Sequence, residues 1–392
     1  MSLFVVIILE AVSYVAGAFL EKWSASIDVK RKYQIYYEQK EMISKMFRSD
    51  TNDIFDPDLG WAYRPNYHGR QYNNNSIGLR GTREYEPVPP QDIIRIAAFG
   101  DSFVYGSEVG DLDTWTYQLE SLLPNVEVLN FGIGGYGTDQ AFLRYLKLGK
   151  QFSPHIVLIG FMSANLRRNV NIYRRFINPS ELVHFKPRFT FDDNNELVLL
   201  PSPVKSPEEF WRFYERPELI KELGHLDFSY KPFVYENPFY DYSASIRLLS
   251  QVVEAGIRRV SSSKRLYNGR YFNPESEAFR ITVEILKRFN AEVKTIGATP
   301  IVLMFPGYDD ISGDVSRRVK GYQPLVDELR LQHIEVVDLS SAFGEVVTKT
   351  QHFMRGGHFS PHSNRLVAEF LAGYLSERLS LQDVSGATHE DS

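Results

Sequence analysis

The chain of 392 residues contains no cysteine, and this absence excludes several classes of chemistry. Without thiols there is no disulfide framework, no thiolate metal site and no cysteine nucleophile, so any nucleophile is an oxygen or an amine. The sequence also lacks a dense basic run. Its 44 Lys and Arg stand against 49 Asp and Glu, for a net charge of −5, and this balance does not fit a protein that binds nucleic-acid phosphates. We expect no nucleic-acid partner.

Signatures of bound cofactors are missing as well. The sequence has no Walker phosphate loop and no Gly-x-Gly-x-x-Gly run that opens a helix after the first expected strand. The acidic group Asp309, Asp310 and Asp314 does not have the spacing of a calcium-binding loop, and it is more typical of a solvated turn after a strand. We therefore expect no cofactor and no metal ion.

A hydrophobic run over residues 3–20 is interrupted by a single charge, Glu10. About 18 apolar residues are close to the minimum for a helix that crosses a bilayer, so a membrane anchor is the first interpretation. A cleaved signal is the alternative, because Ala16-Gly17-Ala18 resembles a small-residue cleavage site. No basic segment precedes the run, which favours the anchor. Basic residues after the run favour a cytoplasmic location for the rest of the chain, although long domains cross membranes largely regardless of charge.

Beyond a turn-rich segment, short apolar runs alternate with stretches of helical periodicity, the pattern of a parallel sheet with crossover helices. A long insertion over 167–272 interrupts this pattern. It is rich in aromatic residues, and its one stretch with clear helical periodicity covers 243–260. Aromatic side chains stack on sugar rings, and they also build satellite cores; both interpretations stay open. The expected strands are 94–99, 126–129, 156–161, 300–305 and 334–337, and the expected helices are 114–123, 139–150, 275–296, 319–332 and 364–379.

Polar residues gather where the expected strands end, which is where ligands bind in such sheets. Ser102 follows the first strand and is a candidate nucleophile, and a helix that begins there would aim its N–H groups at an oxyanion. His358, on a glycine-rich turn before the last helix, is the candidate base. Gly135 after the second strand and Asn165 after the third are candidate donors to the oxyanion. Each alone has an ordinary structural explanation, but their shared placement favours a site.

These residues stand in four blocks that resemble the SGNH, or GDSL-type, hydrolase superfamily. The resemblance covers about residues 55–375 outside the insertion, and two upstream runs, 59–61 and 75–81, are similar to those of a membrane-anchored bacterial subgroup. It implies a flavodoxin-like, three-layer α/β/α fold with a five-stranded parallel sheet of order 2-1-3-4-5. It also implies ester chemistry by Ser102 and His358, with the Ser102 backbone N–H, Gly135 and Asn165 holding the oxyanion. The blocks are Gly100-Asp101-Ser102-Phe103, Asn130 to Gly135, Gly160 to Asn165, and His358-Phe359-Ser360-Pro361 with Asn364.

The chain departs from this pattern at the acid. The superfamily places an Asp three residues before the catalytic His, or two before it in alginate-acetylating relatives, and here those positions are Arg355 and Gly356. We expect His358 to be oriented by a backbone carbonyl or by a distant carboxylate such as Asp338, unless the site is impaired.

The third block departs as well. The family's Gly-x-Asn-Asp is replaced by a Gly and an Asn with four residues between them, and another register places Ala164 at the Asn position.

The sequence thus predicts a membrane-anchored, single-pass serine esterase whose catalytic domain lies outside the cytoplasm. Its expected substrate is a small acyl ester, with a cell-envelope carbohydrate as the candidate carrier. Two alternatives remain: an O-acyltransferase that moves an acyl group to a glycan, and a non-catalytic accessory protein that has lost the triad acid. A membrane-protein partner is also a hypothesis. The expected parts are an anchor over 1–22, a juxtamembrane helix and linker over 23–53, the hydrolase-like domain over 54–380 with its insertion, and a disordered tail over 381–392.

Overall fold

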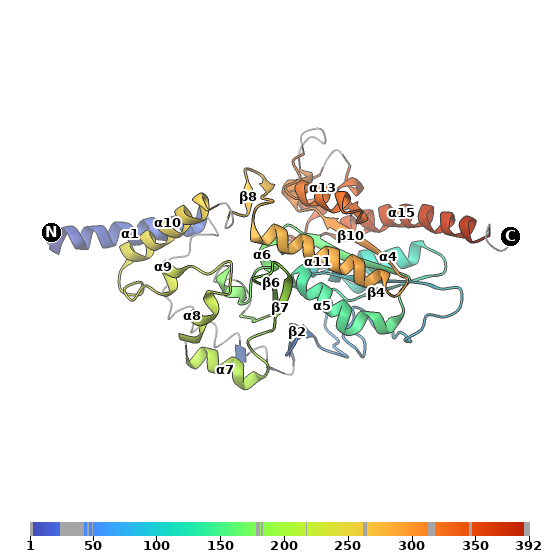
Figure 1. Ribbon diagram of the computed structural model, residues 1–392, viewed down its shortest axis with the longest axis horizontal. Helices are drawn as coiled ribbons and strands as arrows, with labels where there is room; N and C mark the ends of the chain where they lie inside the picture. Colours follow the sequence, from blue (N-terminus) through green and yellow to red (C-terminus); the bar gives the residue numbers. More distant parts are fainter. Residues whose placement is uncertain are drawn as a thin grey trace. The chain divides into compact units, whose positions relative to one another are not determined.

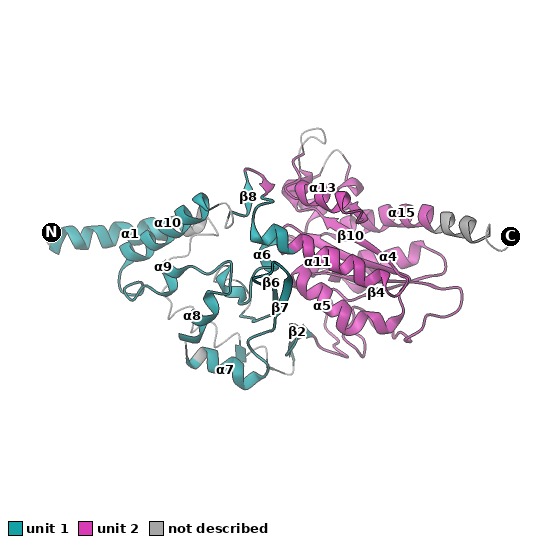
Figure 2. Ribbon diagram, in the orientation of Figure 1, with its two compact units in different colours: residues 1–62, 166–268, 273–281 teal, residues 63–165, 269–272, 282–392 magenta. Residues whose placement is uncertain are grey.

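The computed structural model describes residues 3–23, 43–44, 47–48, 50–177, 181, 183–216, 218–261, 265–312, 318–344 and 347–387. The chain divides into two compact units, which are described separately (Figure 2). Unit 1 comprises residues 1–62, 166–268 and 273–281, and unit 2 comprises residues 63–165, 269–272 and 282–392. The aromatic-rich insertion therefore belongs with the N-terminal segment. The expected juxtamembrane helix lies almost wholly outside the described residues, as does Asp314.

Unit 2 is built on a five-stranded parallel sheet in the order β11-β10-β5-β3-β4. Numbered along the chain, this is the order 2-1-3-4-5, so the predicted flavodoxin-like α/β fold is confirmed. Strands β10 and β4 of this sheet are labelled in Figure 1. The strands are β3 (Ile94–Phe99), β4 (Val126–Asn130), β5 (Ile156–Met162), β10 (Thr299–Phe305) and β11 (Val336–Asp338).

Buried side chains alternate along β3 between two layers of helices, because successive residues of a strand point to opposite faces. Ile96 and Ala98 join the core that is shared with α4 and α15. Phe99 packs on the other face, where its ring lies edge-on to Tyr145 of α5 with centroids 5.5 Å apart. The helices are α4 (Trp115–Leu122), α5 (Thr138–Leu148), α11 (Glu277–Lys294), α13 (Gln323–Leu331) and α15 (Pro361–Ala387). Helix α15 thus continues into the segment that the sequence assigns to a tail.

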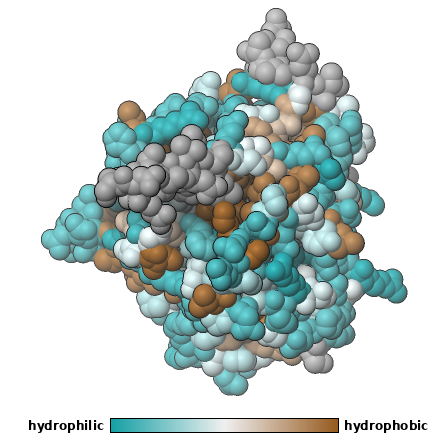
Figure 3. Space-filling view, turned by 90° about the vertical axis from the view of Figure 1, so that its right-hand side faces the viewer, coloured by the Kyte–Doolittle hydropathy of each residue, from teal (hydrophilic) through white to brown (hydrophobic). Residues whose placement is uncertain are grey.

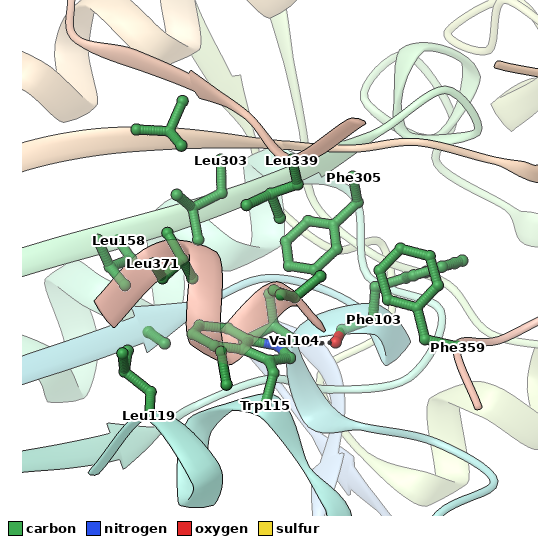
Figure 4. Packing of buried hydrophobic residues seen from close by; sticks show 14 of the residues in the cluster. Phe103, Val104, Trp115, Leu119, Leu158, Leu303, Phe305, Leu339, Phe359 and Leu371 are labelled. Atoms are coloured by element: carbon green, nitrogen blue, oxygen red, sulfur yellow. Dashed lines mark hydrogen bonds between the residues drawn. The ribbon is translucent and has the colours of Figure 1, made fainter. Parts of the chain in front are cut away.

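Beneath the carboxyl edge of the sheet, aromatic side chains hold the segments that carry the candidate residues (Figure 4). Phe103 and Phe359 are almost completely buried, and their rings meet edge to face with centroids 5.0 Å apart. The indole Nε1 of Trp115 donates a hydrogen bond to the Phe103 carbonyl at 3.1 Å. The residues directly after Ser102 and His358 are therefore fixed in the core.

Unit 1 has a core of its own in which aromatic rings pack edge to face. The rings of Phe176 and Tyr235 lie at 77°, and those of Phe185 and Phe210 at 75°. These side chains are buried among one another, so the satellite-core interpretation fits them. The elements are β1 (Asp53–Asp56), β2 (Gly60–Tyr63, whose last residue falls in unit 2), β6 (Arg188–Phe191), β7 (Leu197–Leu200), α7 (Pro207–Glu215), α8 (Glu218–Gly224), α9 (Pro232–Tyr235) and α10 (Ala244–Val260).

Unit 1 begins with helix α1 (Leu3–Trp23), which packs along α10. Its window Leu3–Leu20 has a mean hydropathy of 2.3 and is only 11% buried. By length and composition the helix suffices to cross a membrane, as an anchor or as a signal sequence. On the face shown in Figure 3, by contrast, hydrophilic side chains cover most of the surface and hydrophobic ones form small groups between them, as is usual for a surface in water.

Candidate active site

The nucleophile candidate, Ser102, is the first residue of the single-turn helix α3 (Ser102–Tyr105), which follows β3. The Asp101 carboxylate caps this turn by accepting a hydrogen bond from the Phe103 N–H at 2.9 Å. Gly132, from the loop after β4, lies against the turn: a Cβ there would lie 2.3 Å from the Tyr105 nitrogen. Only glycine lets this loop approach the backbone behind Ser102 so closely.

The base candidate, His358, lies on a tight hairpin between two aromatic anchors. The isolated bridge between Phe353 and Phe359 closes the hairpin, and the Met354 N–H donates to the His358 carbonyl at 2.7 Å. Gly357 takes a φ of +93°, a backbone conformation that favours glycine. The hairpin thus fixes the backbone that carries the imidazole.

The structure brings Ser102 and His358 together although they are 256 residues apart in sequence. The Ser102 Oγ lies 2.8 Å from the His358 Nε2. On the other side of the ring, the His358 Nδ1 lies 2.7 Å from the Glu108 Oε2. Serine, imidazole and carboxylate thus form a hydrogen-bonded chain with the order and spacing of a catalytic triad.

Glu108 is the carboxylate beside His358 that the sequence analysis did not name. Asp338 is bound elsewhere, because its carboxylate accepts hydrogen bonds from the Lys320 Nζ at 2.7 Å and from the Tyr322 hydroxyl at 2.9 Å. A distant carboxylate does contact His358, as one of the two expectations stated, but it is Glu108 and not Asp338, and the expected backbone carbonyl is not its partner. Glu108 comes from the loop directly after the nucleophile turn, which also carries Asp111 and Asp113, so a search of that loop for carboxylates would have given three candidates.

Gly356 provides the space for this carboxylate. A Cβ at this position would lie 2.6 Å from the Glu108 Oε2. The Gly356 N–H donates to the Glu108 Oε1 at 2.8 Å, and the His358 N–H donates to Oε2 at 3.3 Å. The position two residues before His358 thus carries no side chain, and the carboxylate of Glu108, from another loop, lies in the space beside it. Arg355 is exposed, so its charge is solvated.

The hydrogen bonds to Glu108 favour its charged form. Burial of the carboxylate opposes ionisation, but the bonds from the His358 side chain and from the two backbone N–H groups outweigh it, and the net effect is a lowered pKa. Glu108 therefore stays an anion at neutral pH. A negative carboxylate on Nδ1 fixes the imidazole tautomer whose Nε2 accepts the serine proton.

The loop that carries Glu108 is held by the upstream run that the sequence analysis singled out. The Arg80 guanidinium is buried, lies 2.7 Å from an Asp111 carboxylate oxygen and donates to the Val109 carbonyl at 2.8 Å. It also lies over the Tyr72 ring, 4.7 Å from its centroid. The Tyr72 hydroxyl in turn accepts a hydrogen bond from the Glu108 N–H at 2.9 Å. These contacts hold Glu108 at a φ of +70°, which is costly for a residue with a side chain.

The three candidate oxyanion donors differ in what they bind. Within the described part of the chain, the backbone N–H groups of Ser102 and Gly135 have no hydrogen-bond acceptor, so both are available to a ligand. The Asn165 amide is buried, and its Nδ2 donates to the Asp101 carboxylate at 3.2 Å and to the Tyr136 carbonyl at 3.0 Å. Both amide hydrogens are therefore engaged. The oxyanion role of Asn165 stays a prediction that requires one of these bonds to open.

The four-residue spacing before Asn165 is accommodated by a turn. The Asn165 Oδ1 accepts a hydrogen bond from the Met162 N–H at 2.7 Å and closes the turn after β5. Ala164 is exposed, whereas the Asn165 side chain points under the nucleophile turn. Asn165, and not Ala164, therefore places its side chain beside Asp101.

Comparisons with known proteins give one kind of match. No protein-family model matches the chain, and no curated protein matches it by sequence. Solved structures of GDSL-type hydrolases are similar to it. A lipase/acylhydrolase from Enterococcus faecalis is 14% identical, covers 73% of this chain and 97% of its own, and gives a TM-score of 0.35. A GDSL-like lipase from Bacteroides thetaiotaomicron VPI-5482 is 10% identical, with 74% and 91% coverage and a TM-score of 0.34.

A third such structure is a member of the lipolytic protein G-D-S-L family from Veillonella parvula DSM 2008. It is 12% identical, covers 70% of this chain and 94% of its own, and gives a TM-score of 0.32. The descriptions of the Bacteroides and Veillonella structures name the GDSL family that the sequence motifs resemble, and that of the Enterococcus structure names a lipase/acylhydrolase. The reaction proposed below rests on the geometry of Ser102, His358 and Glu108.

Among the described residues, no group of three or more His, Asp or Glu side chains is arranged to hold a metal ion. Asp310, from the acidic group after β10, binds the backbone N–H groups of Gly307 and Gly321 at 2.8 and 3.3 Å. This carboxylate is thus used within the fold.

Proposed function

We propose that the chain is a serine ester hydrolase of the SGNH type that acts on small acyl esters. The single observation that carries the proposal is the hydrogen-bonded chain from Ser102 through His358 to Glu108. A protein that had lost its triad acid would have no reason to keep a carboxylate at hydrogen-bond distance from Nδ1 in a conformation with positive φ. This argues against the non-catalytic alternative.

In the proposed reaction the Ser102 Oγ attacks the ester carbonyl carbon while the His358 Nε2 takes the hydroxyl proton. The Glu108 carboxylate stabilises the imidazolium that forms. The carbonyl oxygen becomes an oxyanion that accepts hydrogen bonds from the Ser102 and Gly135 N–H groups, each such donor contributing about 3 kcal/mol. Collapse of the intermediate breaks the ester C–O bond, and the imidazolium gives its proton to the leaving alcohol. Water then attacks the acyl-serine by the same route and releases the acid.

The proposed substrate class is an acyl ester of a cell-envelope carbohydrate, because α1 would hold the enzyme at a membrane. If a sugar hydroxyl rather than water takes the acyl group from Ser102, the same site acts as an O-acyltransferase. Incubation with an acyl donor and an oligosaccharide acceptor separates the two: we expect free acid, whereas acylated oligosaccharide would identify a transferase.

Covalent labelling of the full chain with a fluorophosphonate probe tests the site directly. We expect one adduct by intact mass in the wild type and none in Ser102→Ala. His358→Ala should label much more slowly, because the hydroxyl then has no base. The surface variant Ser121→Ala, from α4, is the control and should label like the wild type. An unlabelled, folded wild type would refute the proposal.

A further inference from the structure

Helix α10 in unit 1 is amphipathic, but its polar face is buried and its apolar face is exposed, the opposite of a surface helix in a water-soluble protein. Its polar side chains Arg247, Gln251 and Glu254 are buried against unit 1. Its apolar side chains face outward: Leu249 is 62% exposed and Val252 is 57% exposed. In water a surface helix places its apolar face toward the protein, so this orientation calls for an apolar neighbour outside.

The buried polar face is held in this orientation by specific hydrogen bonds. The Arg247 Nη1 donates to the Tyr240 carbonyl at 3.2 Å, and the Gln251 Nε2 donates to the Tyr240 hydroxyl at 3.1 Å. The Glu254 carboxylate accepts a bond from the Phe233 N–H at 2.8 Å. Rotating α10 to bury its apolar face would break all three bonds, which is unfavourable for buried polar groups.

The N-terminus of α10 is joined to the middle of α1 through Glu10, the one charge in that apolar run. The Glu10 carboxylate accepts hydrogen bonds from the Ser243 hydroxyl at 2.5 Å and from the Ala244 N–H at 2.7 Å. One turn further along α1, the Ser13 hydroxyl lies 3.1 Å from that of Ser245. Glu10 thus meets backbone N–H groups that the first turn of a helix leaves without partners, and its negative charge lies at the positive end of the helix dipole.

We propose that α10 lies in the lipid bilayer beside α1, with its outward face of Leu249 and Val252 against acyl chains. Three observations identify lipid as the neighbour. Helix α1 packs along α10 (Figure 1), and both helices carry exposed apolar side chains. Glu10 is the eighth residue of an 18-residue span, about 10 Å along the helix axis from its start, so a membrane-spanning α1 carries the N-terminus of α10 into the bilayer with it. The last turn of α10 carries the exposed cation Arg259, and a cation there suits lipid phosphates at the interface.

This inference does not depend on the proposed esterase activity. It assigns Glu10 a role as the group that joins two membrane-embedded helices. Ionisable residues within apolar spans are expensive in lipid and are usually paired. It also makes the unit 1 insertion part of the membrane attachment, which α1 would otherwise provide alone.

The absence of cysteine makes a site-directed test simple, because single cysteines can be introduced into the full chain without removing others. Leu249→Cys and Val252→Cys would each carry an environment-sensitive fluorophore in vesicles of phosphatidylcholine with phosphatidylglycerol. We expect blue-shifted emission, quenching by nitroxide lipids and protection from iodide. The matched control is Leu331→Cys on α13, a leucine that is 73% exposed and should report water. Water-like emission at both α10 positions would overturn the proposal and would leave a protein partner as the neighbour of this face.

The role of Glu10 is tested by adding Glu10→Ala to the Leu249→Cys chain. We expect the protein to remain in the vesicle fraction, because α1 becomes more apolar, while the probe on α10 loses its nitroxide quenching. The control substitution Tyr14→Ala, on the exposed side of α1, should leave the quenching unchanged. An unchanged probe depth in Glu10→Ala would refute the joint between the helices. A membrane-derived protein whose intact mass lacks residues 1–20 would refute the proposal as a whole.

Discussion

Replacing Glu108 by glutamine tests the proposed triad with the least change of shape. The carboxylate accepts three hydrogen bonds: His358 Nδ1 and the His358 N–H on one oxygen, and the Gly356 N–H on the other. Glutamine keeps one oxygen and presents an NH₂ group in place of the second. If the NH₂ faces Gly356, two donors oppose each other. If it faces His358, it turns the ring to the tautomer that carries a proton on Nε2, which cannot accept the proton of Ser102.

Either orientation of the amide removes the charge that stabilises the imidazolium. The amide replacement of the acid in a serine-protease triad lowers kcat about 10⁴-fold. Since Glu108 keeps 26% of its side chain exposed, water supplies part of the missing stabilisation. We therefore expect a loss in kcat of about 10³- to 10⁴-fold, or about 4–5.5 kcal/mol of transition-state stabilisation.

The assay is steady-state hydrolysis of a short-chain aryl ester by the full chain. The control is Glu369→Gln, on the exposed side of α15, for which we expect kcat within about twofold of the wild type, as is usual for a surface substitution. Near-UV circular dichroism confirms that both variants are folded. A folded Glu108→Gln enzyme that retains more than a tenth of the wild-type kcat would refute the assignment of Glu108 as the acid.

Four further predictions follow from the same contacts. The double variant Glu108→Ala with Gly356→Asp should regain at least about tenfold over Glu108→Ala in ester turnover, because the new side chain enters the space that Glu108 vacates; equal rates for the two would contradict this. Arg80→Met should lower kcat by up to about 10²-fold with little change in KM, because the loop that positions Glu108 is loosened; an unchanged kcat in a folded variant would show that Arg80 does not position the acid. The pKa of Glu108 is lowered in the folded state, so its contribution to stability is complete above the ordinary carboxyl pKa of about 4.3 and is lost as pH falls through the lowered value. The Tm difference between wild type and Glu108→Gln should therefore shrink from neutral pH to about pH 3. A Tm difference that does not change with pH would contradict this. Phe359→Ala and Phe289→Ala both empty buried aromatic sites and should each lower the free energy of unfolding by about 3–5 kcal/mol in denaturant titrations, but only Phe359→Ala should also lower kcat at temperatures where both are folded.

Much of the fold could be predicted from the sequence because the sheet strands are buried on both faces and read as short apolar runs. The expected strand at 94–99 coincides with β3, and the helix expected at 243–260 differs from α10 by one residue. Polar residues directly after such strands meet at one edge whatever the details of the loops. This is why the placement of Ser102 and His358 near each other was predictable.

The acid could not be predicted in the same way, because its position depends on contacts between distant segments. Glu108 reaches His358 only because its loop adopts a positive φ, which the contacts of Tyr72 and Arg80 stabilise. None of these contacts leaves a periodic signal in the sequence. The sequence does show a glycine at position 356, two residues before His358. A glycine indicates only that a side chain is missing and not which group fills the space.

The contact between Glu10 and Ser243 can form only after both segments have been synthesised. The two residues are 233 positions apart, and ribosomes add about 5–20 residues per second. The N-terminal helix therefore exists for roughly 10–50 s before the segment that caps against its carboxylate has been made. During this interval the Glu10 carboxylate is without the Ser243 and Ala244 donors that it has in the folded chain. Unit 1 is complete only when the first helix and the middle of the chain meet, and a chain that begins after residue 22 would lack one half of that contact from the start.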